Sequence, residues 1–157
     1  MKRLALLVLC VFALLGACSS KKPAAESYSA SLSPYNHTAD HIEPYVDGMF
    51  GGHSSAYGGG GSFVCCISYP AVWRPGLSAK VRWATSSGIP GDRRPEAYVQ
   101  HWHEKIVPIE EYTVPGGMLN IHFLPEGDVR LIISSKGAGA KNYPGPAYPV
   151  KPSDWKW

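Results

Sequence analysis

Residues 77–84 read LSAKVRWA, and this stretch is the clearest evidence for the fold. Apolar side chains occupy alternate positions: Leu77, Ala79, Val81 and Trp83. Because successive side chains of a β-strand point to opposite faces, this alternation predicts a strand with one buried face and one solvated face. Strands of this kind are typical of antiparallel sheets that cover a core with one side only.

The same period of two recurs on both sides of this stretch. It is found in residues 63–69, 105–109, 119–123 and 129–133, and a weaker strand is expected at residues 41–47. The last two segments are joined by a Pro-Glu-Gly-Asp turn and predict a hairpin. Pro108 predicts that its strand lies at a sheet edge or a bulge, since proline has no N–H to donate.

The chain has 17 glycines and 14 prolines, which favour short strands and turns over long helices. We therefore predict an all-β fold, a small antiparallel sandwich or half-open barrel of five or six strands. The one segment that a helix would fit is residues 95–102, where Asp92 would be the cap and Pro95 the first residue.

The N-terminus predicts an export signal, since Lys2 and Arg3 precede an apolar run at residues 4–15. This run is shorter than the roughly 20 residues of a membrane-spanning helix. The residues that follow resemble the bacterial lipobox, in which a cysteine is acylated and the signal is cleaved before it. We expect residues 1–17 to be a lipoprotein signal peptide and Cys18 to be the site of lipid attachment. The alternative is an ordinary secretory signal whose cysteine is incidental.

The mature chain is expected to begin with a tether. Residues 18–36 contain few large apolar groups, so they are not expected to form a core. We predict that they comprise the lipidated N-terminus and a flexible tether. Ser19, in place of Asp after the lipidated position, points to the outer membrane. A β-domain is expected at residues 37–146 and an aromatic, proline-rich tail at residues 147–157.

Four cysteines reduce to one pair, because Cys10 leaves with the signal and Cys18 carries lipid. Cys65 and Cys66 then have three interpretations: a buried reduced pair, a vicinal disulfide or a redox-active pair. The oxidising environment of an exported protein favours a disulfide between these two thiols. Neighbouring Cα atoms are about 3.8 Å apart, closer than the roughly 4.4–6.8 Å of most disulfides, so a bridge requires a break in the pleat. The glycines at residues 58–61 would permit positive φ or a close backbone approach there.

Two histidines are weak candidates for a metal site. His101 and His103 share one face of a strand and would bind zinc or copper with a further ligand such as His122 or Glu104. No third ligand is fixed by spacing, so a solvated pair on either side of a packed Trp102 is the alternative. We therefore assign no metal and no cofactor. The remaining histidines lie in loop-like sequence and are expected to form no site: His37, His41 and His53.

Two stretches come close to a catalytic or a phosphate-binding motif but do not complete it. Residues 52–56 lack the second glycine of a hydrolase elbow, and the glycines at residues 58–61 lack the lysine of a phosphate-binding loop. We expect no catalytic residue and no enzyme activity. The formal net charge of +3 falls to +1 when Lys2 and Arg3 leave with the signal, and the remaining charges are interspersed, which excludes a nucleic-acid footprint.

Aromatic residues indicate a binding surface. Several tyrosines and four tryptophans exceed what a small core would bury: Trp73, Trp102, Trp155 and Trp157. Exposed tryptophans concentrate binding energy at protein interfaces. The alternative is that most of them cover the edge of the core.

Four stretches resemble proteobacterial lipoproteins grouped as domain of unknown function 3304. They are GGGGSFVCCISYP at residues 58–70, WRPGLSAKVRW at 73–83, HEKIVPIEEY at 103–112 and LNIHFLPEGDVRLIIS at 119–134. The resemblance extends over about residues 45–146, leaves out the C-terminal tail and brings no catalytic residues with it.

The resemblance implies a lipoprotein of the cell envelope, and Ser19 favours attachment at the periplasmic face of the outer membrane. Such lipoproteins are often encoded near type VI secretion genes, including those for lipase effectors, so an immunity or accessory protein that binds a secreted effector is expected. The alternative is a structural or assembly lipoprotein of the envelope without a toxin partner.

Overall fold

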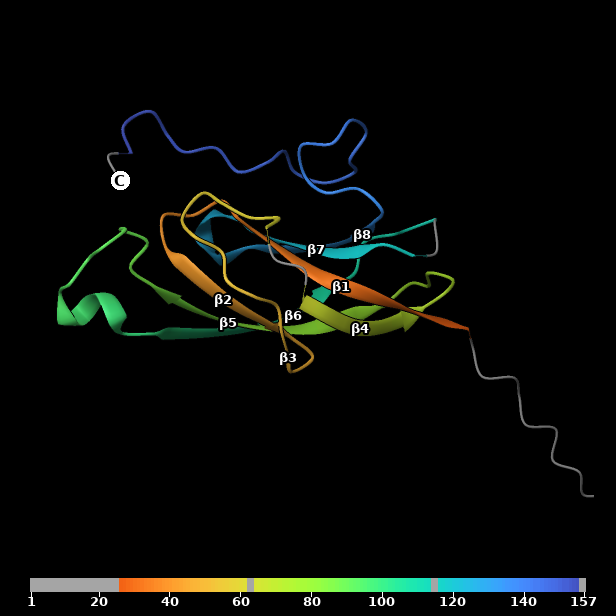
Figure 1. Ribbon diagram of the computed structural model, residues 1–157. Helices are drawn as coiled ribbons and strands as arrows, with labels where there is room; N and C mark the ends of the chain where they lie inside the picture. The colour runs from red at the N-terminus through yellow and green to blue at the C-terminus, as the bar shows by residue number, and fades with distance from the viewer. Residues whose placement is uncertain (1–25, 62–63, 114–115, 156–157) are drawn as a thin grey trace, which may run out of the picture.

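The computed structural model describes residues 26–61, 64–113 and 116–155. The predicted signal peptide, Cys18 and Trp157 lie outside these ranges. Two four-stranded sheets pack face to face (Figure 1). The first, called the β1 sheet, has the order β4 (Val64–Pro70), β1 (Ser27–Asn36), β7 (Met118–Phe123) and β8 (Val129–Ser134). The second, called the β5 sheet, has the order β3 (Met49–Phe50), β2 (His41–Val46), β5 (Ser78–Ser86) and β6 (His101–Pro108).

Neighbouring strands are antiparallel throughout, except that β1 and β7 run parallel. The prediction of a small all-β sandwich is confirmed. The described residues form eight strands rather than five or six, because β1 and β3 were not predicted. The β7–β8 hairpin and the edge position of β6, which contains Pro108, are also confirmed. The sheets meet at one corner, where the backbone of Glu110 donates to the carbonyl of Leu131 at 2.9 Å.

Helical structure in the described ranges is limited to two short 3-10 turns, η1 (Pro95–Tyr98) and η2 (Pro125–Gly127). None of the helices in this part of the chain has the length and apolar character needed to cross a membrane. The segment predicted to fit a helix is therefore helical only at η1, which starts at Pro95. Asp92 does not cap it, because its carboxylate is bonded to the Arg94 side chain at 2.7 Å and to Ser87 at 2.9 Å.

β1 corrects the prediction that residues 18–36 are a flexible tether. This strand lies between β4 and β7, so both of its edges are paired. Ala30 and Leu32 have no exposed surface and belong to the core. Pairing on both edges satisfies the backbone of a strand that is poor in large apolar residues, and such context outweighs composition. Only residues 18–25 of the predicted tether lie outside the described ranges.

The core lies between the two sheets and is formed by the inward-facing side chains of both. The alternation first noted in β5 is confirmed, since Ala79, Val81 and Trp83 are buried. The fully buried apolar side chains include Leu32, Ile42, Val46, Val81, Leu119, Ile121, Phe123 and Leu131. Each contributes roughly 1.5–3 kcal/mol through removal of its apolar surface from water.

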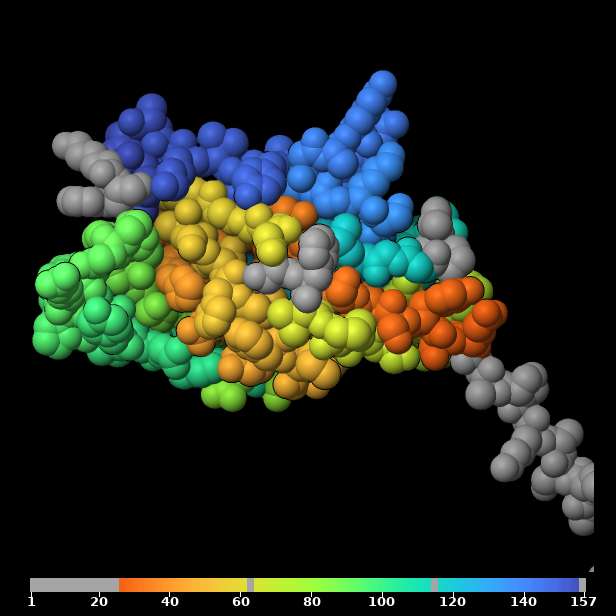
Figure 2. Space-filling model, in the orientation of Figure 1, coloured from red at the N-terminus to blue at the C-terminus, as the bar shows by residue number. Residues whose placement is uncertain are grey.

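The outer face of the β1 sheet is covered by residues 137–155, called the C-terminal segment (Figures 1 and 2). The backbone N–H of Ala138 donates to the hydroxyl of Tyr35 at 3.1 Å, and the Tyr148 hydroxyl donates to the Gly59 carbonyl at 2.9 Å. Pro149 is buried. The predicted tail is thus packed on the sandwich as far as it is described. The outer face of the β5 sheet has no comparable cover among the described residues.

Candidate functional site

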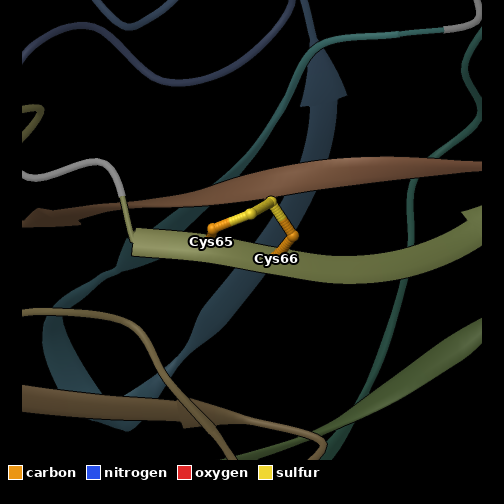
Figure 3. The surroundings of a disulfide bond; sticks show 2 residues. All are labelled: Cys65 and Cys66. Carbon is orange, nitrogen blue, oxygen red and sulfur yellow. A yellow bond between two sulfur atoms is a disulfide. The ribbon is translucent and has the colours of Figure 1, made fainter.

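The disulfide lies on β4, an edge strand of the β1 sheet. The sulfurs of Cys65 and Cys66 are bonded to each other beside β1 (Figure 3). The register between β1 and β4 shifts after Ala30, so that both cysteines face the single residue Ser31. Such a bulge breaks the pleat, as a bridge between neighbours requires. Cys65 is exposed and Cys66 half-buried, which does not fit the interpretation as a buried reduced pair.

The glycines before the disulfide run close to the backbone of β1. Asn36 donates its N–H to the Gly58 carbonyl at 2.7 Å, and Gly60 donates its N–H to the Pro34 carbonyl at 3.0 Å. A Cβ on Gly59 would lie 2.5 Å from the Pro34 carbonyl oxygen. The expected close backbone approach is confirmed, and it leaves no room for a side chain at Gly59.

The four tryptophans do not form one surface. Trp73 is half-buried against the core and donates its indole N–H to a backbone carbonyl at 3.0 Å. Trp155 is half-buried, with its ring centroid 5.1 Å from that of Tyr57, and Trp157 lies outside the described residues. Trp102 differs, because 43% of its surface is exposed. Among the described tryptophans, it is the one classed as exposed.

Trp102 lies on the outer face of the β5 sheet, in a group called the Trp102 face: Tyr45, Phe50, Arg82, Trp102 and Ile106. The guanidinium carbon of Arg82 is 4.0 Å from the centroid of the Trp102 ring, a cation–π contact. The centroids of Tyr45 and Trp102 are 5.9 Å apart, and those of Tyr45 and Phe50 are 5.3 Å apart. Ile106 is 67% exposed.

This arrangement follows from strand register. Arg82 belongs to the face of β5 that was predicted to be solvated, and it pairs with Glu104 of β6. Side chains at positions 102, 104 and 106 of β6 therefore point outward with it. Glu104 forms an ion pair with Lys80 at 3.0 Å. The result is an exposed aromatic and aliphatic face with charges of both signs beside it.

His101 and His103 face the other side of β6. They line a cavity of about 500 Å³ at the open end of the sandwich, with Trp83 on its wall. His103 stacks on Trp83 at a centroid distance of 5.1 Å. The suggested further ligands do not reach this pair, because Glu104 points to the opposite face and His122 belongs to the β1 sheet. Neither histidine belongs to a group of three converging ligands among the described side chains.

A buried polar cluster lies between the β1 sheet and the C-terminal segment. His122 has no exposed surface, and its Nδ1 is 3.0 Å from Nε2 of His37. Its Nε2 is 2.6 Å from the hydroxyl of Tyr143. The Tyr35 ring stacks on His122 with a centroid distance of 4.8 Å. A neutral imidazole has one donor and one acceptor nitrogen, which suits these two partners.

Burial determines the protonation of this cluster. Removal from water, followed by the nearby His37 and Arg130, lowers the pKa of His122 to about 3. Burial also lowers the pKa of His37 and raises the pKa of Tyr143. His37, His122 and Tyr143 are therefore uncharged near neutral pH. Its chemistry is that of a structural hydrogen-bond network that attaches the C-terminal segment to β7.

The side chains that contact Trp102 in the folded protein were not predicted from the sequence. The alternation in β5 was sufficient to place Arg82 on a solvated face. Its position beside Trp102 depends on the register between β5 and β6, which is set across a loop of 14 residues, 87–100. No local pattern specifies such a register, since it results from the packing of the whole sheet.

Comparison with known proteins identifies one family. The family model described as "Protein of unknown function (DUF3304)" matches residues 35–131. The matched region includes the disulfide, the Trp102 face and the histidines of the buried cluster, and it ends before Tyr143. No match was found among curated proteins or among solved structures.

Proposed function

Since the chain belongs to the DUF3304 family, we propose that it is an envelope lipoprotein, anchored through Cys18, that acts by binding another protein. The Trp102 face is the binding surface. The observation that supports this choice is the exposed Trp102 ring, held by Arg82 at 4.0 Å on the sheet face that the C-terminal segment leaves open. Tryptophan, tyrosine and arginine are the residues in which binding energy is concentrated.

The rigidity of the face supports this role. Trp102 and Arg82 project from neighbouring strands, so their backbone positions are fixed before any partner arrives. Little side-chain freedom is then lost on binding, because Trp102 already contacts Arg82 and lies beside the Tyr45 ring. A pre-organised aromatic surface of this kind gives affinity without chemistry at the site.

The partner that we propose is a secreted lipase effector of a type VI secretion system, against which the chain acts as an immunity or accessory protein. The support is the resemblance to lipoproteins encoded near such genes. An anchor at the periplasmic face of the outer membrane would place the domain where an effector that attacks lipids arrives.

Binding measurements with the effector encoded beside the gene test the proposal. Trp102→Ala should weaken binding about 30-fold, since loss of a hot-spot side chain costs about 2 kcal/mol or more. Val72→Ala is the matched control, because Val72 is 79% exposed in the loop between β4 and β5, outside the Trp102 face. It should bind like the wild type. Circular dichroism of both variants checks that the fold is retained.

Two results would contradict the proposal in different ways. If Trp102→Ala binds the effector as tightly as the wild type, the Trp102 face is not the binding surface. If no neighbouring effector binds but an envelope protein is retained through Trp102, the chain is a structural or assembly lipoprotein and not an immunity protein.

A further inference from the structure

Three side chains with metal-binding atoms converge beside β2. His41 and Glu43 alternate on this strand and therefore project from the same face. His53 comes from the chain that follows β3. The Oε1 atom of Glu43 is 3.8 Å from Nε2 of His41 and 3.5 Å from Nδ1 of His53. All three ligand atoms lie within 4.8 Å of one another.

The backbone holds His53 in this position. Ile42 and Ser54 exchange two backbone hydrogen bonds, each 2.9 Å long. This antiparallel bridge places His53 directly opposite Glu43. β3 pairs with β2 in a different register, and residues 51–52, both glycine, lie between the two pairings. Gly52 has a φ of +89°, which other residues rarely adopt. The site is thus built by a register shift at two glycines.

Glu43 lies within ion-pair distance of both histidines, and the two imidazole rings stack with a centroid distance of 5.6 Å. At 3.8 Å, His41 and Glu43 are too far apart for a hydrogen bond. The other carboxylate oxygen of Glu43, Oε2, accepts a hydrogen bond from the Gln100 amide at 3.1 Å. This contact orients the carboxylate and leaves Oε1 directed at both histidines. Hydrogen bonds of this kind commonly orient the ligands of metal sites.

We infer that His41, Glu43 and His53 bind a zinc ion. Two imidazoles and one carboxylate are a ligand set that zinc accepts, with a further position left for water. Around a tetrahedral zinc ion, ligands at about 2.1 Å lie about 3.4 Å from one another, close to the two separations measured here. His41 and Glu43 also line a cavity of about 390 Å³ beside η1, which gives a small molecule access to these two side chains.

This inference does not depend on the proposed binding of an effector, and it is tested without a partner. The full chain, purified without a polyhistidine tag, is titrated with Zn²⁺ in a calorimeter and with Co²⁺ in a visible spectrometer. One equivalent of Zn²⁺ should bind, and Co²⁺ should give the absorption of a tetrahedral complex. Glu43→Gln and His53→Ala should each weaken Zn²⁺ binding at least tenfold.

His101→Ala is the matched control, because His101 is an exposed histidine of a pair that lacks a third converging ligand among the described residues. It should bind Zn²⁺ like the wild type. His53 has a side chain that is 60% exposed, so its removal should leave the fold intact, and thermal melting checks this. Absence of stoichiometric Zn²⁺ in the wild type overturns the inference. The inference is also overturned if Zn²⁺ binding is lost in His101→Ala and kept in His53→Ala.

Discussion

His122 is a titratable side chain without exposure to solvent, and this gives it a measurable effect on stability. Its pKa in the folded protein is lowered to about 3, whereas an unfolded chain has a histidine pKa of about 6.5. As the pH falls below about 6.5, the unfolded state therefore binds a proton that the folded state does not. Stability is complete above that pH and decreases toward pH 3.

We predict that His122→Gln reduces this pH dependence. The contribution of His122 to the slope is at most about 1.4 kcal/mol per pH unit. Urea denaturation at pH 7.5 and pH 5 measures it, and the wild type should lose about 2 kcal/mol more than the variant between these values. His37 and His41, whose pKa values burial also lowers, will leave some dependence in both proteins.

The exposed His101 gives the control for this experiment. His101→Gln should retain the pH dependence that His122 contributes, because this exposed substitution leaves the buried imidazole unchanged. An equal loss of stability on acidification in the wild type and in His122→Gln would show that the buried imidazole is not responsible.

At single residues, the sequence showed which side chains were notable by type, but it did not predict which side chains lie beside them. The exposed Trp102 and the adjacent cysteines were both singled out by residue type. The convergence of His41, Glu43 and His53 was not predicted, and His41 and His53 were expected to form no site. The His-x-Glu spacing on a strand was a usable signal, but the third ligand arrives through the register shift at residues 51–52.

At the scale of elements, the five strands with a clear period of two and the weaker β2 were predicted, whereas β1 and β3 were not. The sequence of β1, SYSASLSPYN, has one large aliphatic residue, Leu32. Its strand conformation results from pairing with β4 and β7, which are distant in sequence. Strand preferences depend on such neighbours, so composition alone suggested a tether. Local sequence patterns also did not predict that the C-terminal segment covers the β1 sheet.

The C-terminal segment provides an element-scale prediction. Tyr143→Phe removes the hydroxyl that lies 2.6 Å from Nε2 of His122 and leaves that buried nitrogen without this partner. We expect a loss of about 1–3 kcal/mol in the free energy of unfolding, measured with urea at pH 7.5.

Tyr148→Phe is the comparison for this effect. Tyr148 belongs to the same segment, but its hydrogen bond to the Gly59 carbonyl is exposed. Water replaces an exposed partner, so this variant should lose less than 1 kcal/mol. Similar losses in the two variants would mean that burial of the His122 contact has no special importance for holding the segment.

For the whole molecule, β1 limits how far the domain can stand from its proposed anchor. The predicted tether ended at residue 36, whereas the sandwich already begins at Ser27. A chain spans at most about 3.3–3.6 Å per residue, so Ser27 lies no more than about 30 Å from a lipid on Cys18. The proposed anchor would therefore keep the start of the sandwich near the membrane, where an effector that attacks lipids acts.

This geometry predicts that the anchor contributes to protection. Cys18→Ala should incorporate no radiolabelled palmitate and should leave the membrane fraction, because the acylated thiol is absent. Cells that produce this variant should survive a periplasm-directed lipase effector less well than cells with the wild type, since the local concentration near the membrane falls. Cys10→Ala is the control, because Cys10 belongs to the expected signal peptide, and it should be labelled and protective. Palmitate labelling that persists in Cys18→Ala would contradict the assignment of the anchor, while equal survival with a soluble Cys18→Ala would show that protection does not require the membrane.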